Sequence, residues 1–308
     1  MGLPLVTLAL GIYLSFASPY FLQQQNLLNI TEAVSVIGIA APFATVVVIS
    51  GGIDLTPVTV MTLAGIVALH TLELGMPVAA VVACSLAAGV AVGLVNGLLI
   101  SLLNLNAFIV TLGTNFLFTG IAYVVTEGSS QVIEDESFLS IGQSRLLFNV
   151  PTASVVMVAS FLVAFVMLRY LRYGTHVFAI GGDESAARLS GVRTVRVKTL
   201  VYVLSGLSAA VAGVVLAAAS GSVAPYAASN ANDLLYILAA VIIGGTALTG
   251  GRGSVVGTFV GVLLLGMIAN GLVLKNISTF WQPVVIGTIL LIAIVLDEVR
   301  RRVELSTA

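Results

Sequence analysis

Charged residues gather in one short stretch of this chain, residues 173–198, which reads YGTHVFAIGGDESAARLSGVRTVRVK. The stretch lies between two long apolar runs, 152–171 and 199–219, in a chain of which only 8% is charged. Its charged residues are Asp183, Glu184, Arg188, Arg193, Arg196 and Lys198. Fixed charges of both signs can form ion pairs and charge-assisted hydrogen bonds with a soluble partner. We therefore interpret this loop as a docking segment.

Residues 183–189, DESAARL, predict a short helix inside this loop. Two acids at its start suit the positive end of the helix dipole, and glycines at 181–182 and 191 punctuate it. We expect the helix to expose Ala186, Ala187 and Leu189. The alternative is an amphipathic loop lying on anionic lipid, because the residues that follow are basic. Mixed charges beside small apolar side chains favour a shallow protein pocket over a headgroup layer.

A second candidate is the segment 50–57, SGGIDLTP, where paired glycines, a carboxylate and a proline interrupt the apolar sequence. An ionisable residue near membrane depth is a functional candidate, because its desolvation is costly. Asp54 is that residue. It also suits an N-cap before Pro57, and we favour the cap. A cap can hold a broken helix beside a solute path, so the two roles are compatible.

The segment 244–254, GGTALTGGRGS, is a second helix-breaking cluster. It is not a phosphate loop, because GxxxxGK[ST] occurs nowhere in the chain. Catalysis and metal binding find no support either: His70 and His176 lie in different regions, and Cys84 is the one cysteine. We expect no cofactor, no metal and no enzymatic activity. Any energy source must come from another chain.

Polar side chains inside the apolar runs are few and uncharged, which argues against a proton relay and mildly favours the permeation of a neutral solute. Each of these side chains could instead form a hydrogen bond between two packed helices, which is the more common role of such a residue. The candidates for a solute path are Asp54, Asn96, Phe108, Thr111, Asn115 and Asn270.

The chain is 59% hydrophobic and its mean hydropathy is +1.14. This composition indicates an integral membrane protein. A bilayer core takes roughly 20 apolar residues of helix, and continuous runs exclude a barrel of alternating strands. Net charge of −1 gives no support for nucleic acid. We predict one all-α polytopic domain over residues 1–308, with about ten transmembrane helices, some short or broken. The segments are 3–17, 32–50, 57–72, 78–100, 107–126, 152–171, 198–219, 234–248, 254–274 and 281–299.

Basic residues orient this prediction, since Lys and Arg concentrate in short cytoplasmic loops. With ten spans, only Arg145 and Lys275 lie on the outer side of the membrane. Both termini then lie in the cytoplasm. The cytoplasmic set is Arg169, Arg172, Arg188, Arg193, Arg196, Lys198, Arg252, Arg300, Arg301 and Arg302. The docking segment 173–198 then faces the cytoplasm, and the acidic loop 127–151 faces outside.

Several motifs, in this order, resemble the permease subunit of bacterial ABC importers for sugars, the ribose-type family. The resemblance covers nearly the whole chain. The motifs are NLLNI (26–30), SGGIDL (50–55), AFIVTLGT (107–114), YGTHVFAIGGDESAARLSGV (173–192), VIIGGTALTGGRGSVVGT (241–258) and NGL (270–272).

The resemblance implies a multi-pass protein of the bacterial inner membrane that works with partners. These are an ABC ATPase, a periplasmic or lipid-anchored binding protein, and a second permease, either an identical copy or a paralogue, within membrane lipid. Residues 181–191 would match the coupling helix that docks on the ATPase. The contact set implied is Gly181, Gly182, Asp183, Glu184, Ala187, Arg188, Leu189 and Gly191. A self-sufficient secondary transporter of a small neutral solute is the alternative. Pentoses, hexoses, nucleosides and sugar derivatives all stay open as solutes.

Overall fold

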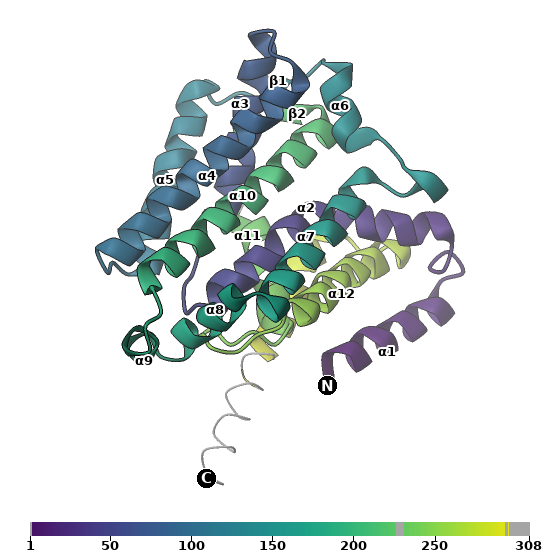
Figure 1. The fold of residues 1–308 in the computed structure, drawn as a ribbon. Coiled ribbons are helices and arrows are strands. Elements are labelled where there is room, and N and C mark those ends of the chain that lie inside the picture. Colours follow the sequence, from purple (N-terminus) through teal and green to yellow (C-terminus); the bar gives the residue numbers. More distant parts are fainter. Residues whose placement is uncertain (1, 226–230, 293–294, 296–308) are drawn as a thin grey trace.

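The computed structural model describes residues 2–225, 231–292 and 295, which form a bundle of long helices (Figure 1). Six of the described helices are long and apolar enough to cross a membrane: α2 (Gln24–Ile49), α4 (Val78–Leu102), α5 (Ala107–Val125), α7 (Thr152–Tyr170), α10 (Thr194–Ser220) and α12 (Val255–Leu274). Shorter apolar helices are α1 (Gly2–Ala17), α3 (Pro57–Glu73), α11 (Ala231–Ile243) and Gln282–Ile292. Each of these helices overlaps a predicted apolar segment, although α2 begins eight residues earlier than predicted and α11 ends five residues earlier. The third and eighth are short, as expected. The end of the last segment lies outside the described residues.

Short elements connect the long helices at both ends of the bundle. The predicted outer loop 127–151 contains strand β1 (Gln131–Val132), helix α6 (Glu136–Gln143) and a 3-10 turn (Leu147–Asn149). Strand β1 pairs antiparallel with β2 (Ser222–Val223), directly after α10. The predicted docking segment folds as two helices, α8 (Arg172–Gly182) and α9 (Glu184–Leu189). A further 3-10 turn, Thr279–Trp281, precedes the last helix.

Helix α10 is the centre of the bundle and packs against α2, α3 and α4. Its contact with α4 depends on glycines that follow each other every four residues, Gly89, Gly93 and Gly97. A methyl group at Gly93 would overlap the backbone carbonyl of Tyr202, and one at Gly97 would lie 2.8 Å from the Thr199 Cα. Missing side chains therefore let the two backbones approach, which is how helices pack tightly in lipid.

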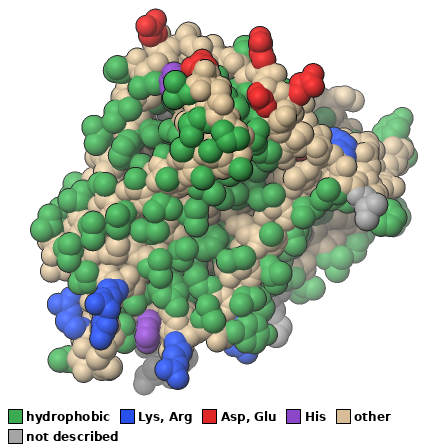
Figure 2. Space-filling model, turned by 45° about the horizontal axis from the view of Figure 1, so that its top comes forward, with side chains coloured by type: hydrophobic (Ala, Val, Ile, Leu, Met, Phe, Trp, Pro, Cys, Tyr) green, Lys and Arg blue, Asp and Glu red, His purple; other side chains and the backbone are tan. Residues whose placement is uncertain are grey.

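The two ends of the bundle differ in charge. Figure 2 shows acidic side chains gathered at one end and basic ones at the other. The basic end carries α9; the described basic residues near it are Arg169, Arg172, Arg188, Arg193, Arg196, Lys198 and Arg252. Arg145 and Lys275 lie towards the end that carries α6. Arg300, Arg301 and Arg302 lie outside the described residues.

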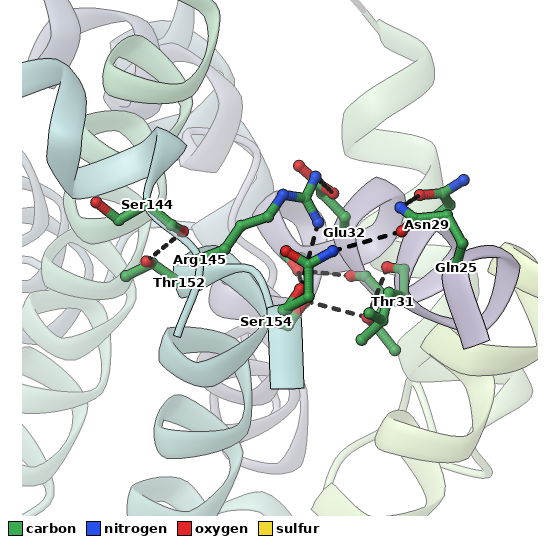
Figure 3. A network of polar contacts seen from close by, with 11 residues as sticks. Gln25, Asn29, Thr31, Glu32, Ser144, Arg145, Thr152 and Ser154 are labelled. Atoms are coloured by element: carbon green, nitrogen blue, oxygen red, sulfur yellow. Dashed lines mark hydrogen bonds and ion pairs between the residues drawn. The ribbon is translucent and has the colours of Figure 1, made fainter. Parts of the chain in front are cut away.

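A polar network ties α2 to α7 at the α6 end (Figure 3). The Arg145 guanidinium contacts the Glu32 carboxylate at 2.9 Å. The hydroxyl of Ser154 donates to that of Thr31 at 3.1 Å, so the start of α7 is held against the first turns of α2. These contacts fix the orientation of α2, which runs from the α6 end to the α9 end.

Candidate functional site

Helix α9 forms where the sequence predicts it, with Asp183 as its N-cap. The Asp183 carboxylate accepts hydrogen bonds from the backbone N–H groups of Ser185 and Ala186, at 2.8 and 3.0 Å. Gly191 ends the turn with a φ of +86°, a conformation that favours glycine. Leu189 is 91% exposed, but Ala187 is only 5% exposed. The expectation that Ala187 faces outward is therefore wrong, because this face of α9 packs against the rest of the chain.

Ion pairs hold α9 on the bundle. The Glu184 carboxylate contacts the Lys198 ammonium at 2.9 Å, which links α9 to the first turns of α10. The Arg188 guanidinium lies 3.5 Å from Glu184 on its own helix, with its side chain 59% exposed. Arg188 and Leu189 are therefore the large outward-facing side chains of α9, beside the exposed Ser185 and Ala186, while Glu184 positions the helix.

Helix α8 is an element that the sequence interpretation missed. The chain turns sharply at Leu171, and Gly174 lies so close to the Leu168 carbonyl that a methyl group there would overlap it. The Tyr173 hydroxyl donates to the Val197 carbonyl at 3.1 Å. Burial raises the pKa of the Tyr173 phenol, so it keeps the proton that this hydrogen bond needs. The docking segment is thus a two-helix element that is bonded to α10 through Tyr173 and Glu184.

Three glycine pairs meet at the base of this element: residues 51–52, 181–182 and 250–251. Gly181 contacts the end of α2, where a methyl group would overlap the Ile49 carbonyl. A methyl group on Gly250 would lie 2.8 Å from both the Gly181 oxygen and the Gly51 Cα. We call this contact the glycine junction. It places the start of α9 directly against both helix-breaking loops.

Asp54 lies in the first of those loops and is 5% exposed. Its carboxylate accepts hydrogen bonds from the Thr56 N–H and hydroxyl, at 2.9 and 2.6 Å, and from the Ser205 hydroxyl at 2.7 Å. The N-cap of α3 is Thr56, so the prediction that Asp54 caps this helix is wrong. Asp54 instead braces the loop before the cap and ties it to α10. Three donors compensate for burial of its carboxylate.

Asn96 extends this cluster to α4 and α5. Its amide nitrogen donates to the Thr56 hydroxyl at 3.3 Å, and its oxygen accepts from Thr114 at 2.7 Å. The Thr111 hydroxyl reaches the Ile53 carbonyl at 3.4 Å, as does the Tyr202 hydroxyl from α10. Residues of α3, α4, α5 and α10 therefore converge on the break between α2 and α3.

The remaining predicted path residues, Asn115, Phe108 and Asn270, lie outside this cluster. Asn115 accepts a hydrogen bond from Thr59, one turn further along α3. Phe108 is half-exposed at the start of α5. Asn270 pairs with Asn26 through two amide hydrogen bonds, of 3.1 and 2.7 Å, at the α6 end of the bundle.

Sequence reasoning missed Ser205, Thr56 and Tyr202 as members of the cluster. Thr56 had a signal, because it stands two residues after Asp54, the spacing of a side-chain-to-backbone turn. Ser205 and Tyr202 had none, since polar residues in an apolar run do not reveal which helix they face. Within the described ranges, no three His, Cys, Asp or Glu side chains gather as metal ligands would.

The long apolar helices and the difference in charge between the two ends define a polytopic α-helical membrane protein. Residues 26–294 match the family described as the permease component of branched-chain amino acid transport systems. The chain belongs to this family. It is therefore a multi-pass transport subunit of the bacterial inner membrane and not an enzyme.

Curated relatives align over nearly their whole length. The ribose import permease protein of Bacillus subtilis is 37% identical over 290 residues, which cover 94% of this chain and 89% of the relative. The L-arabinose transport system permease protein of Escherichia coli is 35% identical over 303 residues, 98% and 92% of the two chains. A probable ABC transporter permease protein of Escherichia coli is 38% identical over 297 residues, 96% and 88% of the two chains. No solved structure matches.

Proposed function

We propose that this chain forms the membrane path of an ABC importer for a sugar or sugar-like solute, driven by a separate ATPase. The relatives that transport ribose and L-arabinose support the solute class. Apart from Asp54, the polar side chains at the α2–α3 break are hydroxyls and an amide, which suit a neutral solute better than an ion. A self-sufficient transporter would need coupling-ion sites, and among the described spans Asp54 is the main candidate, already held by three donors.

In this proposal the α9 end faces the cytoplasm, and the ten apolar helices all cross or enter the membrane, with both termini inside. Seven of the nine described basic residues lie at that end, as the positive-inside rule requires. The start of α1 lies towards the same end (Figure 1). The acidic end with α6 then faces a periplasmic or lipid-anchored binding protein.

The docking segment 173–198 is the coupling element, with Arg188 and Leu189 as its outward contacts. The glycine junction is the observation that carries this role. Because Gly181 touches the end of α2 and Gly250 touches Gly51, a displacement of α8 and α9 must move both helix-breaking loops. Asp54, Asn96 and Thr111 lie at the α2–α3 break. A displacement of α9 therefore reaches the candidate solute path through few intervening contacts.

A second permease, identical or paralogous, completes the path in this proposal, with lipid around the pair. Helix α5 packs chiefly against α3 and α4, and its opposite face is exposed. On α5, a methyl group at Gly113 or Gly120 would meet nothing within 4 Å. Small residues on an open helix face allow another helix to approach closely.

The test is co-purification with the ATPase after a charge reversal, Arg188→Glu. Loss of the ATPase with normal membrane insertion is expected, because Arg188 projects from α9 and makes only a weak intrahelical pair. Arg196→Glu, exposed at the first turn of α10, is the matched control for charge at the same end. Unchanged ATPase association and uptake in the Arg188 variant would contradict the docking role. Uptake into liposomes by this chain alone would contradict the importer.

A further inference from the structure

A partly enclosed cavity of about 290 Å³ lies between α2, α11, α12 and the last helix. It is in the half of the bundle nearer α6, because it is lined by the first half of α2, the first turns of α11 and mainly the second half of α12. None of the path candidates from the sequence lines it. Its size is at the small end of ligand pockets, which span about 300–1,000 Å³.

The wall of this cavity combines apolar surface with three polar groups. Asp233 and Tyr236 stand one turn apart on α11, and Gln282 begins the last helix on the other side. In the part of the chain that the structure describes, neither the Tyr236 hydroxyl nor the Gln282 amide has a hydrogen-bond partner. Val34, Val262 and Leu265 supply apolar surface between them. The phenol of Tyr236 and the amide of Gln282 therefore have hydrogen-bonding capacity left for a molecule in the cavity.

We propose that this cavity is an outer binding subsite for a monosaccharide-sized polyol, an inference that rests on the proposed function. The carboxylate accepts hydrogen bonds from hydroxyl groups, the amide both donates and accepts, and the phenol does either. The apolar wall and the tyrosine ring suit the C–H face of a sugar. A mostly apolar pocket with a few convergent polar groups is the usual form of a small-molecule site.

A lipid acyl chain is the competing occupant of this cavity. A second groove of the molecule has the apolar lining that an acyl chain would need. The groove between α1 and α12 is lined by Leu8, Ile12, Leu263 and Met267, with only the Thr7 and Ser15 hydroxyls as polar side chains. Both hydroxyls already donate to backbone carbonyls of α1, so this groove offers no free donor. The α11 cavity differs by offering a phenol and an amide that have no hydrogen-bond partner among the described residues.

The position of the cavity also orders the transport sequence. It lies at the end that faces the binding protein in the proposed orientation, whereas the glycine junction lies at the opposite end. A solute released at the outer face would meet the α11 cavity before the α2–α3 break. The cavity would therefore contribute to solute selection at entry.

Thiol accessibility tests this directly. Cys84→Ser removes the native thiol, and Ala269→Cys then places one in the cavity wall. A membrane-impermeant thiol reagent is added from outside, with D-ribose, L-arabinose or sucrose present. We expect either pentose, but not the larger sucrose, to slow labelling at Ala269→Cys. Val273→Cys, exposed one turn along α12, should label at the same rate with and without sugar.

The polar groups are tested in the same background. Gln282→Ala and Tyr236→Phe each remove a hydrogen-bonding group, so the pentose concentration for half-protection should rise about 2- to 12-fold. Leu235→Ala, exposed on the opposite side of α11, should leave that concentration unchanged. Labelling at Ala269→Cys that no pentose slows, or protection that neither variant weakens, would overturn the subsite.

Uptake by the complete importer separates this proposal from the function on which it rests. If the wild-type complex takes up a pentose but Ala269→Cys shows no protection, the subsite fails and the transport function stands. If the complex, with ATPase and binding protein, takes up no sugar, both fail.

Discussion

The carbonyl oxygen of Ile49 accepts a hydrogen bond from the Gly251 N–H at 2.9 Å. This contact joins the end of α2 to the loop before α12, and Gly181 lies against the same carbonyl. Both helix-breaking loops and the end of α8 therefore meet at one backbone contact. No side chain is involved, so side-chain flexibility cannot absorb a displacement there.

Gly181→Ala tests the glycine junction. The added methyl group would overlap the Ile49 carbonyl, so α8 must shift, at a cost of about 1–3 kcal/mol. We expect uptake to fall while ATPase association persists, because α9 itself is unchanged. Gly182→Ala is the matched control, since a methyl group there meets nothing within 4 Å. Equal uptake by the two variants would contradict a role of the junction in coupling.

Gly93→Ala tests the contact of α4 with α10. A methyl group there would overlap the Tyr202 carbonyl, and we expect a loss of about 1–3 kcal/mol in the free energy of unfolding. Gly113→Ala on α5 adds the same group in open space and should be neutral or stabilising by up to about 1 kcal/mol through helix propensity. Thermal unfolding in detergent compares the two; a Gly93 variant as stable as the Gly113 variant would contradict this packing.

Ser205→Ala tests the brace between α10 and the α2–α3 loop. It removes a donor to the buried Asp54 carboxylate, and we expect a loss of about 1–3 kcal/mol. Ser208→Ala is the control, because its hydroxyl bonds only to the carbonyl of Ser205 on the same helix. Thermal unfolding in detergent should place Ser205→Ala below Ser208→Ala. The reverse order would show that Asp54 does not depend on α10.

A double-mutant cycle on Asn26 and Asn270 tests whether Asn270 is structural. Their two amide hydrogen bonds predict a coupling of about 0.5–1.5 kcal/mol for each bond in unfolding. The KM for uptake should stay unchanged in both single variants. A raised KM with no coupling energy would return Asn270 to the solute path.

Much of the fold could be predicted because membrane helices are local features. A helix satisfies its own backbone, so an apolar run of sufficient length predicts a span without knowledge of its neighbours. The short helix with Asp183 at its start was predictable for the same reason, since a cap acts within a few residues. Helix α8 was missed because its eleven residues carry three glycines, which lower helix propensity. Packing against α7 and α10 stabilises it.

The sequence by itself determined the class of protein, the number of apolar segments, their charge asymmetry and the position of the short charged helix α9, since each depends on composition and short-range order. Only the tertiary structure decided which polar residues meet. Asp54 meets Ser205, Asn270 meets Asn26, and the glycine pairs at 51–52, 181–182 and 250–251 form one junction. Glycine pairs far apart in the chain look alike as helix breakers. Their convergence depends on helix directions and packing distances, which no single segment encodes.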